Sequence, residues 1–386
     1  EDALTQAGAD MDKMTKPVES SSATKEEVTL DADIVVVGGG AAGLTAALSS
    51  QQNGNSVILL EKTGVVGGAS AMAGAGTMAT GSQWQKEDGY EDSPEQLKAD
   101  MLKNGHNNND EATLDIYVNT TGAAFDWLVS EDGANVPYER DGKPTRSYSG
   151  QGRGAGVVSS LSESFTTGGG TLMTNTPATE LIVEDGVVKG VKASDETKNY
   201  TINAKAVILA TGGFAANSKM VQEYNTSGKW NDLSKVMTTN RFSSSQGDGI
   251  SMALEVGASL TDMEQIQLLY LGNVKDGQLT KYPPRDVNGT DQIIFINKEG
   301  KRFVREDGRR DEICLAVMAQ TDSMFYMLES GDGAGYVDIQ DPNWRSADGF
   351  TFDYLKENGY ILVADTLDDL ASQMGIDAAT LKETVD

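Results

Sequence analysis

The stretch Asp33-Ile-Val-Val-Val-Gly-Gly-Gly-Ala-Ala-Gly-Leu-Thr-Ala-Ala-Leu48 predicts a strand, a tight glycine turn and a helix. Its β-branched run, residues 34–37, is typical of a parallel strand that is buried on both faces. Gly38, Gly40 and Gly43 then follow the pattern G-x-G-x-x-G. In that pattern the first glycine permits the turn, the second lets the backbone approach a pyrophosphate, and the third lets the helix pack on the strand. We therefore expect a dinucleotide at the N-terminus of this helix.

The surrounding sequence supports this interpretation. A second short apolar strand is predicted at Ser56–Leu60, and Glu61 follows it, 23 residues after Gly38. An acidic residue at an offset of roughly 20 residues binds a ribose hydroxyl in dinucleotide-binding βαβ units. The alternative is a βαβ unit that binds no ligand.

Further glycine-rich segments follow later in the chain. Residues 64–76 are nearly all small, which leaves room for a flat ligand. The turn Asp185-Gly186 predicts a hairpin between strands at 178–184 and 187–193. A buried strand at 206–210 leads into Thr211-Gly-Gly213, which predicts a second approach of the backbone to the same ligand.

Two other segments carry clear patterns. A helix is predicted from Asp110 to about Ser130, and we expect Ile116, Ala123, Phe125, Trp127 and Leu128 to lie largely on one side of it. Further on, a strand pair is predicted at 292–297 and 301–304, followed by a helix through Cys314.

Composition excludes several classes of function. The formal net charge is −27, so nucleic acid and acidic membrane surfaces are unfavourable partners. No apolar run is long enough to span a membrane. Cys314 is the only cysteine and His106 the only histidine, and the latter lies in a polar run where we expect a solvated loop. A disulfide, a cysteine-built metal site and a histidine triad are thereby excluded within this stretch.

Five motifs in order resemble one protein family. They are Val36-Val-Gly-Gly-Gly-Ala-Ala-Gly43, the Gly67-Gly68 loop, Ala210-Thr-Gly-Gly-Phe214, Gly247-Asp-Gly249 and Asn297-Lys-Glu-Gly-Lys-Arg-Phe-Val304. From about residue 31 onward the chain is similar to the flavoprotein of the fumarate reductase and succinate dehydrogenase family. The soluble branch, with flavocytochrome c fumarate reductase and urocanate reductase, is the most similar.

The resemblance implies FAD as cofactor. The three glycines of the turn would hold the pyrophosphate, and Glu61 would hold the adenosine ribose. Relatives that link FAD covalently use a histidine in the loop that reads Gly68-Ala-Ser70 here, so we expect FAD to be non-covalent. The implied cofactor residues are Gly38, Gly40, Ala41, Ala42, Gly43, Glu61, Lys62, Gly68, Ala69, Ser70, Gly74, Gly76, Ala178, Ala210, Thr211, Gly212 and Asp248.

The resemblance also implies a mechanism. In the family, hydride passes from flavin N5 to the β-carbon of an unsaturated carboxylate, and an arginine delivers a proton to the α-carbon. Arg310 matches that arginine. Asp286 falls at the position of the carboxylate that resupplies the proton, and Arg285 could replace the second arginine, because the family position itself is Gly289. Arginine's high pKa requires such a carboxylate beside it.

One departure bears on the substrate. The family has a carboxylate-binding histidine after its Glu-x-x-Gln segment, whereas Glu264-Gln-Ile-Gln267 is followed here by apolar residues and Tyr270. The loss of a charged anchor makes fumarate a poorer fit, and a tyrosine suits a monocarboxylate that carries a ring, as in urocanate.

We therefore expect an α/β, Rossmann-like FAD-binding domain at residues 31–265 and an α+β capping domain at 266–386. Residues 1–30 have the composition of a linker. We expect the natural protein to continue at both ends, with some of the capping domain missing. The predicted partners are an unsaturated carboxylate and an electron donor with flavin or haem. The acidic composition favours a secreted or cell-surface reductase over a cytoplasmic one. A ketosteroid dehydrogenase-like enzyme and a non-catalytic FAD-binding module are the alternatives.

Overall fold

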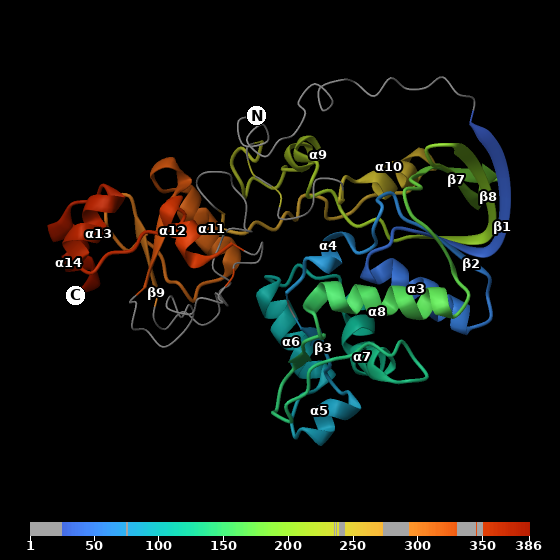
Figure 1. The fold of residues 1–386 in the computed structure, drawn as a ribbon, viewed down its shortest axis with the longest axis horizontal. Coiled ribbons are helices and arrows are strands. Elements are labelled where there is room, and N and C mark those ends of the chain that lie inside the picture. The colour runs from blue at the N-terminus through green and yellow to red at the C-terminus, as the bar shows by residue number, and fades with distance from the viewer. Residues whose placement is uncertain are drawn as a thin grey trace.

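A six-stranded sheet organises the first half of the chain (Figure 1). The computed structural model describes residues 25–74, 76–234, 236, 238, 244–272, 293–329, 345 and 350–386. The strand order is β5-β2-β1-β8-β7-β6, in which β5, β2, β1 and β8 are mutually parallel and β7 is antiparallel to both its neighbours. The strands are β1 (Glu26–Val37), β2 (Val57–Leu60), β5 (Thr171–Met173), β6 (Ala178–Glu184), β7 (Val187–Ser194) and β8 (Lys198–Leu209).

Strand β1 is longer than the sequence pattern predicted. It begins at Glu26, so residues 26–30 do not belong to a linker as expected. They pair in parallel with the first half of β8, from Glu26 opposite Lys198 onward. Val28 and Leu30 alternate with polar residues, which gives this segment a single half-buried face, and that is sufficient for a strand that is paired along its length. Residues 1–24 lie outside the described residues.

Both faces of the central strands are buried. Val36 and Leu59 pack with helices α3 (Ala41–Gln52) and α8 (Arg153–Thr167) in one core cluster. Their neighbours Val35 and Ile58 pack in a second cluster on the opposite face, which includes Met252 of α10 (Asp248–Glu255). Figure 1 shows α3 and α8 on one side of the sheet and α10 on the other. The continuous apolar run is thus explained by helices on one face and, on the other, by a cluster formed with residues of β6, β7 and β8 and with Met252.

The predicted hairpin is confirmed. Asp185 and Gly186 have φ angles of 49° and 76°, as a tight turn with two left-handed residues requires, and β6 and β7 pair antiparallel on either side. The strand predicted at 206–210 is the end of β8, whose earlier residues extend the hairpin into a three-stranded antiparallel ribbon.

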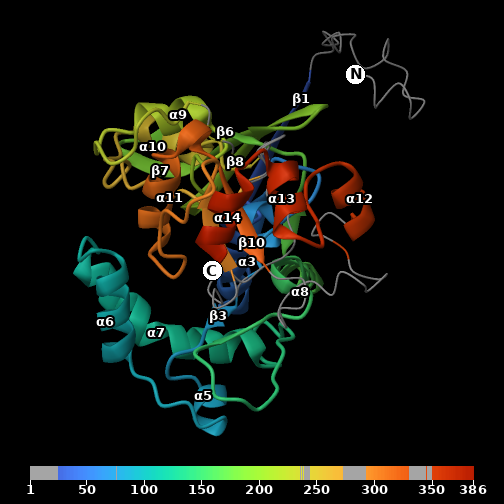
Figure 2. The ribbon, with the colours of Figure 1, turned by 90° about the vertical axis from the view of Figure 1, so that its left-hand side faces the viewer.

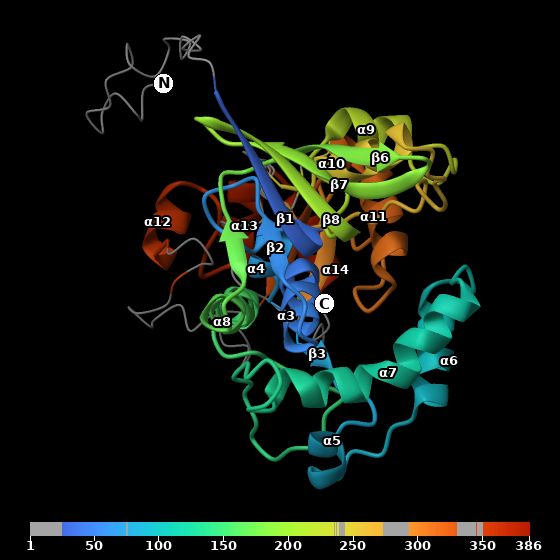
Figure 3. The ribbon, with the colours of Figure 1, turned by 90° about the vertical axis from the view of Figure 1, so that its right-hand side faces the viewer.

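A helical lobe, residues 77–148, lies below α3 and α8 in Figure 3. Ser93 and Asp110 cap its two main helices by accepting hydrogen bonds from the backbone N–H groups of Gln96 and Thr113. The prediction for the second helix was correct for Phe125, which is fully buried, and wrong for Ile116, which is 68% exposed. The elements are β3 (Thr77–Met78), α5 (Gln83–Glu87), α6 (Pro94–Asn104), α7 (Glu111–Val129) and β4 (Ser147–Tyr148).

The C-terminal lobe, residues 293–386 where described, is a two-stranded sheet between helices (Figure 2). Alternate residues of β9 (Ile293–Asn297) face opposite sides, so that Phe295 packs on α11 (Arg310–Met318) and Ile296 packs on α13 and α14. The remaining elements are β10 (Phe325–Glu329), α12 (Phe352–Glu357), α13 (Leu367–Met374) and α14 (Ala378–Val385).

The strand predicted at 301–304 is not formed. After the turn at Gly300 the chain makes a single bridge, Ile296 with Arg302, and then leaves the sheet. The antiparallel partner of β9 is instead β10. Arg302 pairs with Glu306, whose carboxylate accepts the N–H of Phe295, and this contact replaces the continued strand ladder.

The fold class is confirmed as α/β with a mostly parallel sheet and a second α+β lobe. Within the described residues, every helix is too short or too polar to cross a lipid bilayer.

Candidate functional site

A cavity of about 620 Å³ lies at the carboxyl ends of β1, β2 and β8. This is where parallel α/β sheets bind ligands, and the volume is within the range of small-molecule and cofactor sites. Thirteen of the seventeen residues predicted to contact the cofactor line it: Gly38, Gly40, Ala42, Glu61, Lys62, Gly68, Ala69, Ser70, Ala178, Ala210, Thr211, Gly212 and Asp248.

The three glycines of the turn differ in what they contact. Gly38 has a φ of 108°, and a Cβ there would lie 2.4 Å from the carbonyl oxygen of Ala210. A Cβ at Gly43 would lie 1.9 Å from the carbonyl oxygen of Gly38. At Gly40, by contrast, the nearest atom would be Ser70 Oγ at 3.6 Å. The fold itself therefore needs glycine at 38 and 43, whereas Gly40 leaves space on the cavity side for a ligand.

The N-terminus of α3 meets the cavity without a side-chain cap. Gly40 is the N-cap residue, and the first turn contains no acidic side chain. Ser70 Oγ accepts a hydrogen bond of 3.2 Å from the N–H of Ala41. The remaining N–H groups of the first turn and the positive end of the helix dipole suit a pyrophosphate.

Glu61 joins the glycine turn to the end of β2. Its Oε2 accepts the N–H of Gly39 at 2.8 Å, and its Oε1 accepts both the N–H and the hydroxyl of Thr63, at 2.8 and 2.9 Å. The residue is 8% exposed and faces the cavity. A carboxylate has about four acceptor sites, so the group can still accept from a ribose diol.

A second wall of the cavity comes from α10 and the turn after β8. Asp248 begins α10 and pairs with Lys62 across the cavity, with 2.6 Å between Oδ2 and Nζ. Gly249 packs directly on Thr211, where a Cβ would lie 2.2 Å from the hydroxyl oxygen. The two late glycine motifs therefore meet in space, as a shared ligand site requires.

Four predicted cofactor residues do not line this cavity. Ala41 and Gly43 lie inside the first turn of α3. Gly76 packs on β4, where a Cβ would lie 3.0 Å from the carbonyl oxygen of Tyr148, and a Cβ at Gly74 would meet no atom within 4 Å.

Several cavity residues were missed. Some of them are adjacent in the sequence to predicted residues, and that adjacency was a signal by which they could have been found. Others, such as Glu255, come into place only through the packing of α10. The missed residues are Val37, Gly39, Leu60, Thr63, Val65, Pro177, Thr179, Ser244, Ser245, Ser251, Met252 and Glu255.

Arg310 and Tyr270 form a second group, outside the residues that line the cavity. Arg310 is the first residue of α11, is exposed, and has no ion pair with a carboxylate of the described residues. The Tyr270 ring packs on Phe295 and Phe325, with ring centroids 5.7 and 6.2 Å apart. Burial raises the pKa of Tyr270, and the charge of Arg310 opposes that shift. The predicted relay residues, Asp286 and Arg285, lie outside the described residues.

Two other residues, His106 and Cys314, lie near Arg310. His106 was expected to be a solvated loop residue; its side chain is 43% exposed, but it contacts Asp311 and Arg309 of the C-terminal lobe. Burial raises the pKa of Cys314 to about 11, which keeps the thiol protonated. Among the residues that the structure describes, no His, Cys, Asp and Glu side chains gather as a metal site.

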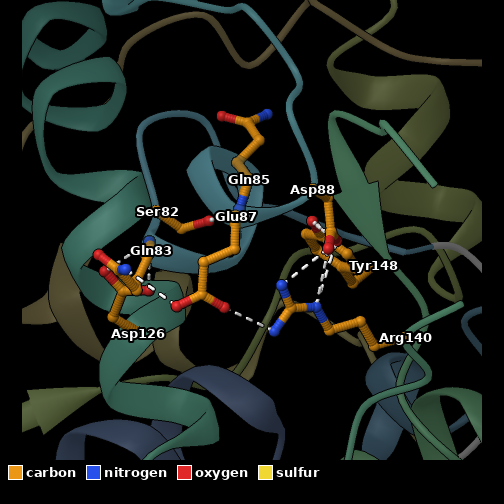
Figure 4. A network of polar contacts seen from close by, with 8 residues as sticks. All are labelled: Ser82, Gln83, Gln85, Glu87, Asp88, Asp126, Arg140 and Tyr148. Atoms are coloured by element: carbon orange, nitrogen blue, oxygen red, sulfur yellow. Dashed lines mark hydrogen bonds and ion pairs between the residues drawn. The ribbon is translucent and has the colours of Figure 1, made fainter. Parts of the chain in front are cut away.

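A polar network in the helical lobe fixes the strand next to Gly76 (Figure 4). Asp88 is paired with Arg140, at 2.7 Å between Oδ1 and Nη2, and accepts the hydroxyl of Tyr148 at 2.6 Å. Glu87 also pairs with Arg140, at 2.8 Å. Arg140 lies over the Trp84 ring, 5.0 Å from its centroid. The polar groups of this network are ion-paired or hydrogen-bonded with one another, which indicates a structural role.

Comparison with known proteins identifies the cofactor. The profile of the family described as FAD binding domain matches residues 33–386. A urocanate reductase from Eggerthella lenta is 35% identical over 407 residues, which covers 100% of this chain and 63% of that protein. A fumarate reductase (cytochrome) from Shewanella frigidimarina is 34% identical, over 85% of this chain and 55% of that protein.

A solved structure agrees with these relatives. The open conformation of a flavocytochrome c3 fumarate reductase has a TM-score of 0.69 and 25% identity, and the match covers 97% of this chain and 63% of that one. The chain thus spans somewhat more than half the length of each of these three relatives. Its cavity, glycine turn and Glu61 fit a bound FAD. This chain therefore belongs to the FAD binding domain family, as its motifs indicated, and FAD is the cofactor of the site.

Proposed function

We propose that the protein is an FAD-dependent reductase of the C=C bond of an α,β-unsaturated carboxylate. The observation that carries this proposal is Arg310. It is a permanently charged group at the start of α11, beside the half-buried Tyr270, and no described carboxylate neutralises it. An unpaired guanidinium matches a carboxylate substrate in charge and geometry.

FAD, when bound, supplies the hydride for this reduction. The residues of the chain orient the substrate and supply the proton. We assign Arg310 as the proton donor to the α-carbon. Arginine is a weak acid, so this role requires a carboxylate that returns the proton, and we propose Asp286, assisted by Arg285, for that step.

The substrate proposal rests on Tyr270. Because burial raises its pKa, the hydroxyl stays protonated and can donate a hydrogen bond, but it cannot neutralise a second carboxylate. Its ring belongs to an aromatic cluster with Phe295 and Phe325. We therefore favour a monocarboxylate with a ring, the chemistry that the name of the urocanate reductase relative describes, over the dicarboxylate fumarate.

We also propose that FAD is bound non-covalently. The loop Gly68-Ala-Ser70 borders the cavity without a histidine, and Ser70 Oγ is engaged with the N–H of Ala41. The electron donor is proposed to be a haem or flavin domain or protein, in keeping with the name of the cytochrome-type relative. We also propose a secreted or cell-surface location, on the basis of the formal charge of −27.

Anaerobic turnover with reduced methyl viologen as electron donor tests this function. Urocanate, cinnamate and fumarate are offered in turn to the full-length protein, and NMR detects the saturated product. Formation of a saturated carboxylate by any of them supports the proposal. Absence of product with all three, from protein that retains FAD, contradicts it and favours a non-catalytic flavin module.

A further inference from the structure

Both chain neighbours of Arg310 are held by residues from outside the C-terminal lobe. Asp311 Oδ2 lies 3.0 Å from His106 Nε2 and 2.6 Å from Lys229 Nζ. Arg309 Nη1 lies 2.7 Å from His106 Nδ1 and 3.2 Å from its Nε2. His106 belongs to the loop between α6 and α7, and Lys229 follows α9 (Ser218–Glu223). Figures 2 and 3 both show that loop of the helical lobe next to α11.

One neutral form of the imidazole satisfies both contacts. A guanidinium has only donors and stays protonated, so the imidazole accepts from Arg309, and the shorter of the two contacts assigns this role to Nδ1. The imidazole proton is then on Nε2, from which it donates to Asp311. A doubly protonated imidazole would lose the bond to Arg309 and place two cations 2.7 Å apart. The other charged groups at this point are Lys229 and the neighbouring Arg310.

The loop backbone and the burial of Asp311 indicate a fixed arrangement. His106 and Asn107 have φ angles of 53° and 58°, a left-handed conformation that few residues other than glycine adopt, although His and Asn are enriched there. The Asp311 side chain is 17% exposed. Burial alone would raise the pKa of Asp311, but hydrogen bonds from Lys229 and then His106 outweigh it and hold the pKa below its usual value.

We infer that His106 is a positioning residue for Arg310, because its single imidazole holds both Arg309 and Asp311 and so fixes the start of α11 against the helical lobe. Arg310 has no ion pair of its own with the described residues, so its chain neighbours set its position. This inference rests on the proposed function, in which Arg310 delivers the proton.

Two substitutions separate geometry from charge. His106→Gln keeps an acceptor for Arg309 and a donor for Asp311 but does not titrate, whereas His106→Ala removes both contacts. The rates are compared with whichever of urocanate, cinnamate and fumarate is reduced fastest. We expect His106→Ala to lower kcat about tenfold with little change in KM, because Arg310, the proposed proton donor, is displaced. His106→Gln should restore most of that rate. Lys98→Ala, which breaks the ion pair with Asp115 in the same helical lobe, is the matched control and should keep the normal rate.

Rescue by glutamine distinguishes positioning from a general structural effect, because His106→Gln and His106→Ala both remove the imidazole and only the former keeps the two contacts. An unchanged kcat in His106→Ala, or a rate of His106→Gln no higher than that of His106→Ala, would overturn the inference.

A readout that does not depend on turnover completes the test. The ¹⁵N NMR signals of His106 are identified in the full-length protein by their loss in His106→Gln. We expect the Nε2–H tautomer in the wild type, held by Asp311, and a shift of the Nδ1 signal in Arg309→Met, in which that nitrogen loses its hydrogen-bond donor. If the wild type reduces no enoate, the proposed function is wrong, but the NMR measurement still tests the contacts of His106 with Arg309 and Asp311. A predominant Nδ1–H tautomer would show that the inferred arrangement is wrong.

Discussion

The carboxylate of Glu61 accepts a hydrogen bond of 2.8 Å from the N–H of Gly39, in the middle of the glycine turn. The residue that is predicted to bind the ribose thus also holds the turn that is predicted to bind the pyrophosphate. Both functions depend on one buried side chain, which is 8% exposed. A change at Glu61 should therefore affect cofactor affinity at two points.

We expect Glu61→Gln to raise the Kd for FAD about tenfold or more, because hydrogen bonds to a charged group contribute about 1.5–3 kcal/mol each. Flavin fluorescence titration of stripped protein measures this value. Glu180→Gln, on the exposed surface of β6 where it pairs with Lys192, is the control and should bind FAD normally. Equal affinity for FAD in the two variants would show that Glu61 does not bind the cofactor.

The glycines of the turn should separate folding from binding. Gly43→Ala places a Cβ 1.9 Å from the carbonyl oxygen of Gly38, so it should destabilise even the flavin-free protein, by about 1–3 kcal/mol. Gly40→Ala meets no protein atom closer than 3.6 Å and should leave the flavin-free Tm nearly unchanged while flavin content falls. Calorimetry of the stripped proteins and flavin absorbance give the two quantities. Full flavin content in Gly40→Ala would contradict the assignment of the pyrophosphate.

Arg310→Lys should lower enoate reduction a hundredfold or more while FAD remains bound. Lysine keeps the charge but loses the planar fork that binds a carboxylate, and its shorter reach moves the donor. Arg305→Lys, on the same segment and paired with Asp307, serves as control and should turn over normally. A normal rate in Arg310→Lys would refute its role.

Tyr270→Phe should raise KM several-fold without changing stability, since the ring packing on Phe295 and Phe325 is retained. The raised pKa keeps the wild-type hydroxyl protonated beyond the ordinary tyrosine value of about 10. The difference in KM between the two proteins should therefore be constant up to at least that pH. A difference that disappears near neutral pH would mean that another group binds the substrate.

The network of Figure 4 should make stability sensitive to acid. Hydrogen bonds from Arg140 and then Tyr148 hold the pKa of Asp88 below its usual value. The resulting stabilisation is present above the unfolded pKa of about 3.9 and is lost as the pH falls through the lower folded value. Arg140→Met should lower the Tm at neutral pH and reduce its further fall on acidification. If the Tm values of the wild type and Arg140→Met fall by the same amount on acidification, the pair of Asp88 and Arg140 does not contribute to stability.

The sequence was most informative where a local pattern decides the structure. The run at 34–37, the glycine turn and the Asp185-Gly186 hairpin were predicted correctly. A strand that is buried on both faces requires apolar residues, and a left-handed turn favours glycine, so both can be recognised in the sequence. The strand predicted at 301–304 failed because β9 pairs with β10, which is 28 residues further along the chain from Asn297 to Phe325. Local sequence cannot report such a pairing.

The candidate site shows the same division. Residues close to the glycine motifs were found, whereas Glu255 of α10 reaches the cavity through packing that no motif encodes. The contact of His106 with Asp311 joins residues 205 positions apart, and the polar sequence around His106 gave no sign of it.

Rapid mixing of anaerobically reduced, full-length protein with urocanate, followed by flavin absorbance, tests the central claim most directly. Cinnamate and fumarate are mixed in the same way as alternative acceptors. The account predicts prompt reoxidation by at least one of the three in the wild type, and reoxidation slowed a hundredfold or more in Arg310→Lys. Flavin that stays bound and reduced in the wild type with all three acceptors would contradict it.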